Sequence, residues 1–94
     1  MALVVKVVNG RVEEYEGGSY RRSYGSNVVD ADSDGSIVAV VTADGRVEEY
    51  RDGSYQRSYG SNAKKVQVSG GTVAVTLRDG RVEEYRNGSY QRSY

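Results

Sequence analysis

The chain has 94 residues, enough for one small domain. Its 13 basic and 13 acidic residues balance, which argues against a nucleic-acid or anionic-membrane partner, because such partners select a basic surface. Cysteine and histidine are absent, so disulfides, thiolate chemistry and the commonest general base and transition-metal ligand are missing. No apolar run is long enough to span a membrane or to form a signal-peptide core. We therefore expect a cytoplasmic protein that uses no cofactor.

Short alternating segments separated by glycine-containing turns predict β-strands along the whole chain. The first strand is expected at Ala2–Val8. Later in the chain, Gly70-Gly71, Asp79-Gly80 and Asn87-Gly88 are pairs typical of two-residue hairpin turns. They separate four expected strands, which are Lys64–Ser69, Thr72–Arg78, Arg81–Arg86 and Ser89–Tyr94. No segment keeps helical spacing of apolar residues for ten positions, so the sequence predicts an all-β fold of four-stranded antiparallel meanders.

The same unit occurs more than once. The pentapeptide Arg-Val-Glu-Glu-Tyr starts at Arg11, Arg46 and Arg81, with a spacing of 35 residues each time. A fixed period of this length indicates a repeat architecture, in which each unit buries its surface against its neighbours. We expect a single repeat domain over residues 1–94, divided into a partial unit at 1–27 and full units at 28–62 and 63–94.

Two-residue turns would also fix the strand register. The pairs expected in the last unit are Tyr85–Tyr90, Glu83–Arg92, Arg81–Tyr94, Leu77–Val82, Val75–Glu84, Ala74–Tyr85, Val68–Val73 and Val66–Val75. This register gives one face rich in valine and a second face rich in alanine and tyrosine. Because both faces are apolar, we expect the sheets to stack, with the valine face of one against the alanine–tyrosine face of the next.

Several segments carry a resemblance to a known repeat. Ser33-Asp34-Gly35 precedes the strand Ile37–Val40, Ala43–Val47 forms a turn into a third strand, and Asp52–Tyr55 a turn into a fourth. In these features the units resemble β-propeller blades, and they are most similar to the WD-repeat family. Tyr50-Arg51 stands where that family has Trp-Asp, and its Gly-His pair is absent. The resemblance implies a propeller that serves as a binding scaffold.

Three units hold eleven strands, which is too few for a closed propeller of about four to eight blades. We expect closure by homo-oligomerisation, as a dimer or a trimer. The alternative is a three-fold monomer of the β-trefoil or β-prism type, although the sugar-binding motifs of those lectins are absent. Near-identical units, the lack of proline and the regular turns are typical of designed or recently duplicated repeats.

The nine tyrosines are the best functional candidates, because aromatic faces beside polar groups suit sugar rings. The tyrosines at the ends of the units are expected to stay exposed, and each has an arginine two residues before it. The candidate carbohydrate-binding residues are Tyr24, Tyr59, Tyr94, Arg22, Arg57 and Arg92. The leading interpretation remains a self-assembling scaffold with no specific activity, and the alternative is a lectin-like module with one site per repeat.

Two acidic patterns in the sequence are candidate sites. Asp30, Asp32 and Asp34 match the opening of a calcium loop, but Val41 stands where that loop needs a glutamate. We retain the three aspartates as candidate metal ligands beside the simpler interpretation of an aspartate-rich turn. The Glu-Glu pairs of the repeat alternate between the two faces of a strand, so they do not converge as catalytic carboxylates, and we expect no enzyme activity.

Overall fold

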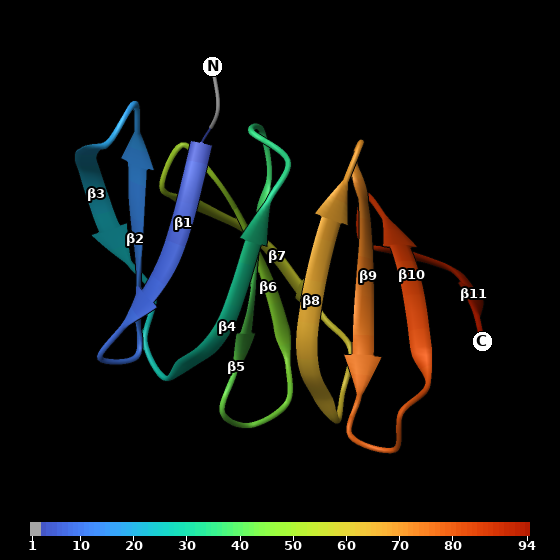
Figure 1. Cartoon of the computed structure of the whole chain (residues 1–94). Coiled ribbons are helices and arrows are strands. Elements are labelled where there is room, and N and C mark those ends of the chain that lie inside the picture. Colours follow the sequence, from blue (N-terminus) through green and yellow to red (C-terminus); the bar gives the residue numbers. More distant parts are fainter. Residues whose placement is uncertain (1–2) are drawn as a thin grey trace.

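In the computed structural model, which describes residues 3–94, the chain forms eleven β-strands in three antiparallel sheets (Figure 1). Each sheet is a meander in sequence order, so the all-β fold of repeated antiparallel sheets is confirmed. Ala2, the start of the first predicted strand, lies outside the described residues. The strands are β1 (Leu3–Val8), β2 (Arg11–Glu16), β3 (Ser19–Tyr24), β4 (Val28–Ser33), β5 (Val38–Thr42), β6 (Val47–Arg51), β7 (Ser54–Tyr59), β8 (Ala63–Ser69), β9 (Thr72–Leu77), β10 (Val82–Arg86) and β11 (Ser89–Ser93).

The three sheets lie side by side (Figure 1), and the same backbone contact joins each pair. The Val28 N–H at the start of the second sheet donates to the Gly10 carbonyl of the first at 2.9 Å. The Ala63 N–H at the start of the third sheet donates to the Gly45 carbonyl of the second, also at 2.9 Å. The sheets are therefore placed by a repeated geometry, but in the described part of the chain they do not close into a ring.

The predicted register across Asp79-Gly80 is wrong by one residue. The Leu77 N–H donates to the Arg81 carbonyl at 2.7 Å, which makes the loop three residues long instead of two. Gly80 takes the left-handed conformation that such a loop needs at its end. As a result Val82 pairs with Thr76, and the predicted pairs Leu77–Val82, Val75–Glu84 and Ala74–Tyr85 are replaced by Thr76–Val82, Val75–Glu83, Ala74–Glu84 and Val73–Tyr85.

A second correction comes from a β-bulge between β10 and β11. The predicted pair Tyr85–Tyr90 is confirmed, but the register then shifts so that Arg92 lies opposite Glu84 instead of Glu83. The same bulge recurs between β2 and β3 and between β6 and β7. The shift also brings Tyr94 beside Val82, through backbone hydrogen bonds of 2.8 and 2.9 Å, instead of beside Arg81. The pairs Val68–Val73 and Val66–Val75 are confirmed.

These registers define two faces on every sheet. We call head face the one that carries Tyr15, Tyr50 or Tyr85, and tail face the one that carries the preceding glutamate and the last tyrosine of the unit. The tail face of the first sheet packs on the head face of the second, and the tail face of the second packs on the head face of the third. The first of these junctions contains Val12, Tyr24, Val28, Val38, Val40 and Tyr50.

The junction between the second and third sheets is the larger apolar cluster. It contains Ala39, Val41, Val47, Ala63, Val66, Val68, Val73, Val75, Leu77 and Tyr85, with Tyr59 packed against it. Face-to-face stacking of the sheets is therefore confirmed, although the predicted division of residues between the faces is not, because Tyr85 lies on the valine side. Among residues 3–94 no helix is long and apolar enough to cross a membrane.

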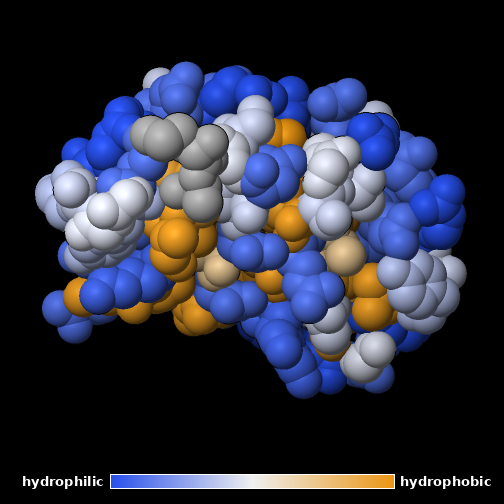
Figure 2. Space-filling model, turned by 45° about the horizontal axis from the view of Figure 1, so that its top comes forward, coloured by the Kyte–Doolittle hydropathy of each residue, from blue (hydrophilic) through white to orange (hydrophobic). Residues whose placement is uncertain are grey.

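Stacking leaves two faces uncovered, the head face of the first sheet and the tail face of the third. Val4 on the first sheet is 59% exposed, and Tyr94 beside the last strand is 65% exposed. Figure 2 shows apolar surface on the part of the molecule that carries the first sheet, next to largely hydrophilic edges. Both ends of the stack therefore expose groups whose counterparts are buried within it.

Candidate functional site

The predicted site residues form one repeated arrangement of glutamate, arginine and tyrosine on the tail faces. In the first sheet Arg22 Nη1 donates to Glu14 Oε1 at 2.9 Å, and the Tyr24 hydroxyl donates to Glu14 Oε2. The other two sets have the same connections, and they are Glu49, Arg57 and Tyr59, and Glu84, Arg92 and Tyr94. We call each set a triad. The β-bulge creates it, because it turns the arginine and the last tyrosine toward the same glutamate.

The glutamate is buried in two of the three triads. Glu14 is 2% exposed and Glu49 is 1% exposed, and a buried carboxylate must be paired to be tolerated. The arginine and the tyrosine of each set supply that pairing, and no buried side-chain polar atom lacks a partner within residues 3–94. Burial, followed by donation to its glutamate, raises the pKa of Tyr24 and of Tyr59 far above the ordinary value of 10.

Each buried triad contacts the next sheet in the same way. The Tyr24 ring lies 4.7 Å from the Tyr50 ring, and the Tyr59 ring lies 4.5 Å from the Tyr85 ring, centroid to centroid. These distances fall in the range of favourable aromatic pairs. The arginines reach across as well, since a Cβ added to Gly53 would lie 2.7 Å from Arg22 Cδ.

The structure thus corrects the expected exposure of the candidate sugar-binding residues. Tyr24 is 9% exposed and Tyr59 is partly buried, whereas both were expected to be free. Only Tyr94 of the three is exposed, together with Arg92, which pairs with Glu84 on the uncovered tail face. Donation from Tyr94 and Arg92 lowers the pKa of Glu84. Among residues 3–94, the triad of the third sheet is therefore the one that offers an accessible tyrosine beside an ion pair.

The three aspartates that are candidate metal ligands accept hydrogen bonds from the neighbouring sheet in this structure. Their carboxylates accept backbone N–H groups of the third sheet, from Val66 to Asp30 at 3.0 Å and from Val68 to Asp32 at 2.7 Å. Asp34 accepts the Gly71 N–H at 2.9 Å. Within the described residues no cluster of acidic or other ligating side chains has the arrangement of a metal site.

These contacts satisfy backbone donors of β8, which is the edge strand of its sheet. Burial alone would raise the pKa of Asp34, but donation from Ile37, Ser36 and Gly71 outweighs it, and the pKa lies below the ordinary 3.8. The aspartates therefore act as charged acceptors that join the second and third sheets. In the sequence, the only sign of these contacts is that each aspartate lies 36 or 37 residues before its backbone donor.

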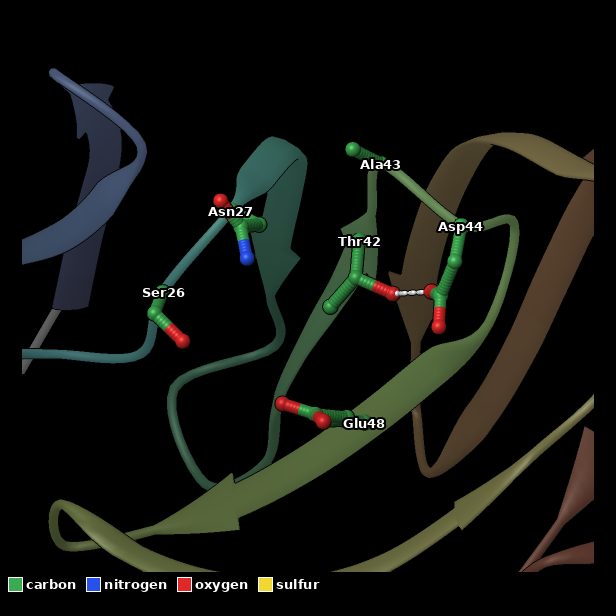
Figure 3. Close-up of a pocket in the computed structure, with 6 residues that line it drawn as sticks. All are labelled: Ser26, Asn27, Thr42, Ala43, Asp44 and Glu48. Carbon is green, nitrogen blue, oxygen red and sulfur yellow. Dashed lines mark hydrogen bonds between the residues drawn. The ribbon is translucent and has the colours of Figure 1, made fainter.

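A polar pocket of about 270 Å³ lies at the junction of the first and second sheets (Figure 3). Its lining residues are Ser26, Asn27, Thr42, Ala43, Asp44 and Glu48. Thr42 donates to Asp44, and this bond lowers the pKa of Asp44. Glu48 accepts the Tyr50 hydroxyl at 2.9 Å. The lining therefore presents mainly hydrogen-bond acceptors to whatever enters.

Sequence reasoning missed this pocket, although a signal for it exists. Thr42 and Ala43 occupy the positions that Leu77 and Arg78 hold one repeat later. Leu77 is buried in the core of the second junction, and Arg78 reaches the Ala43 carbonyl at 3.2 Å. Thr42 and Ala43 are smaller than Leu77 and Arg78, and the space at the first junction follows from this difference in size.

Comparison with known proteins gives one family and a fold. The family model described as the Helicobacter pylori IceA2 protein matches residues 1–54 and, in a second match, residues 44–94. No curated protein sequence matches the chain. Among solved structures, BamB from Moraxella catarrhalis, a β-propeller protein, superimposes with a TM-score of 0.73 at 20% identity. The match covers 96% of this chain but 31% of BamB, and at this identity it concerns the fold alone. The sheets are thus propeller-like blades.

Proposed function

The chain belongs to the IceA2 family, and from its uncovered blade faces we propose that it is a binding scaffold, a propeller completed by association of identical chains. The blade-like sheets and the likeness to BamB support the scaffold part of the proposal. Propellers contain about four to eight blades, and two copies of the three sheets seen here would supply six. No enzyme activity is proposed.

One observation carries the proposal. Tyr24 and Tyr59 stack on the next sheet, whereas Tyr94, which has the same surroundings on its own sheet, is 65% exposed. Exposed faces built like buried ones are typical of surfaces that associate with a partner. In a closed propeller every blade face is covered by a neighbouring blade, which supports association through this face.

We also propose that the triads serve as the buried polar network of these blades. The Trp-Asp and Gly-His residues that serve this purpose in the WD-repeat family are absent from the sequence. Each blade holds a glutamate bonded to an arginine and a tyrosine, and in the first two blades the next sheet covers this set. The triads thus supply a comparable set of polar contacts.

The mass in solution tests the association. Sedimentation velocity over a range of concentrations is expected to show a species of twice the 10.3 kDa chain, or a larger closed ring, that dissociates on dilution. A mass of one chain at all concentrations, up to about 1 mM, would contradict the assembly and leave a monomeric stack of three blades. The lectin alternative with one site per repeat receives less support, because Tyr24 and Tyr59 are covered at the junctions.

A further inference from the structure

The head face of the first sheet and the tail face of the third are uncovered. Together they carry the two halves of the contact that joins neighbouring sheets at both internal junctions. At each internal junction a tyrosine of a tail face stacks on a tyrosine of a head face, and an arginine lies against a glycine of the neighbouring hairpin turn. The tail half is repeated on the third sheet, and the head half is repeated on the first. Each half is without its partner in the described chain.

The tail half is already formed before any partner arrives. The Tyr94 hydroxyl donates to Glu84 Oε2 at 2.6 Å, and Arg92 pairs with the same carboxylate. These are the bonds that hold Tyr24 and Tyr59 in position for stacking. A pre-organised side chain loses little conformational freedom on binding, which favours association.

The head half leaves the corresponding hairpin glycine uncovered, and the Lys6 ammonium lies 5.2 Å from the centroid of the Tyr15 ring on the same face. A Cβ on Gly53 or Gly88 would lie 2.7 or 2.6 Å from the Cδ of Arg22 or Arg57, so glycine is needed where the arginine crosses. Gly18 holds the same position in the first sheet, and nothing lies within 4 Å of a Cβ placed there. Tyr15, the counterpart of Tyr50, stands on the same face.

We propose that two copies of the chain join head to tail, with Tyr94 of one copy stacked on Tyr15 of the other and Arg92 lying across Gly18. This inference rests on the association proposed above and specifies its geometry. The contact is heterologous, so two such junctions close a ring of two chains, whereas tail-to-tail or head-to-head pairing uses neither of the repeated contacts.

Some features make this junction weaker than the internal ones. Lys6 pairs with Glu13, at the place where Val40 pairs with Glu48, so a charge stands on the head face where a valine packs elsewhere. On the tail face Lys65 and Gln67 replace Asp30 and Asp32, which bond to the next sheet within the chain. The junction therefore depends on the tyrosine and arginine contacts.

Two variants block one face each. Tyr94→Ala removes the stacking ring of the tail face. Its control is Tyr90→Ala, on the same β-hairpin, where the tyrosine is 55% exposed against 65% for Tyr94. Gly18→Asn blocks the head face by placing a side chain where Arg92 would lie. Asparagine is used because it adopts positive φ more readily than most other residues, and Gly18 has a φ of 82°. Gly17→Asn is the matched control, because Asn87 is its counterpart in the third sheet.

Native mass spectrometry of the full chain then measures which complexes each variant forms and how strongly they associate. Each blocking variant alone is expected to raise the dimer dissociation constant roughly 30-fold or more, as truncation of an interface anchor does, while both controls associate like the unmodified chain. An equimolar mixture of Tyr94→Ala and Gly18→Asn should form a one-to-one complex, because the intact tail of one meets the intact head of the other.

The outcomes distinguish a failure of the head-to-tail geometry from a failure of the proposed association of identical chains. Strong self-association of Gly18→Asn would indicate tail-to-tail pairing, and strong self-association of Tyr94→Ala would indicate head-to-head pairing. Either result, or a mixture that associates no more strongly than the two variants do separately, overturns the head-to-tail geometry alone. The mixture is compared with the separate variants because it keeps one intact junction, whereas the ring of unmodified chains has two. An unmodified chain that never associates overturns the assembly itself. Circular dichroism confirms that each variant keeps its β-structure.

Discussion

The buried triads should contribute far more to stability than the exposed one, and the chain contains its own control. Glu49 is 1% exposed and accepts Arg57 Nη1 at 2.6 Å and the Tyr59 hydroxyl. Glu84 has the same two partners on the uncovered face. Alanine at either position removes the same atoms from the same local structure. The two substitutions differ only in whether the abandoned arginine and tyrosine lie beneath another sheet.

The size of the effect follows from burial. Glu49→Ala leaves two donors without their acceptor, the partly buried Tyr59 hydroxyl and Arg57, whose side chain is 40% exposed. A buried donor that is left unsatisfied costs about 1–3 kcal/mol. For a domain of this length, about 2 kcal/mol corresponds to a melting temperature lower by about 8 °C or more. Glu84→Ala leaves its partners in water, where exposed ion pairs contribute little, so its melting temperature should stay close to that of the unmodified chain.

The assay is thermal unfolding followed by circular dichroism, at a concentration where sedimentation shows single chains. The condition matters because association would cover Glu84 and make the two positions alike. Equal losses from Glu49→Ala and Glu84→Ala in single chains would refute the reasoning, since burial would then have no influence on the strength of the triad. Tyr59→Phe, which removes only the hydroxyl, should lower the melting temperature less than Glu49→Ala.

Three further results are expected. Lys6→Val should tighten association, because it gives the head face the valine found at the other junctions, and an unchanged dissociation constant in sedimentation would contradict this. Asp32→Ala should speed hydrogen exchange at the Val68 amide by more than 10-fold, as measured by NMR, since that N–H loses its acceptor. Burial, followed by donation to a glutamate, raises the pKa of Tyr50 and of Tyr85 from 10 to about 12. Because the pKa of these tyrosines is higher in the folded than in the unfolded chain, their contribution to the free energy of unfolding is complete below pH 10 and is lost as the pH rises toward 12. Urea titrations should therefore show a free energy of unfolding that falls over that interval. A flat pH profile would be inconsistent with this expectation.

The repeat period and the glycine turns were sufficient to predict the fold class, because each turn pair stands between alternating segments. They were insufficient for the register. Asn9-Gly10 does form a two-residue turn, with φ of 52° and 76°. Asp79-Gly80 closes a three-residue loop, in which Asp79 accepts the Arg81 N–H at 3.0 Å. Both loop types use a polar residue followed by glycine, so composition alone does not distinguish them.

The candidate site was predicted in part for the same reason. Tyrosine and arginine at the end of each unit were recognised as a set, but an unpredicted β-bulge decides which glutamate they meet. One residue of shift moves the arginine from Glu83 to Glu84, which lies on the opposite face. Stacking between sheets then covers two copies and leaves the third exposed. This difference depends on neighbours, so identical sequence segments could not reveal it.

Repeats that are nearly identical in part of their sequence therefore differ in stability, and the residues at the ends of the stack show why this matters. Val41 on an internal tail face is replaced by Thr76 on the exposed one, and Val40 on an internal head face is replaced by Lys6 on the exposed one. These changes make the end faces more soluble, while the triad and its glycine seat are kept. An interface with its anchors intact and its apolar surroundings reduced should associate weakly and reversibly. The chain would then open and close its ring with concentration, whereas its internal junctions stay permanently formed.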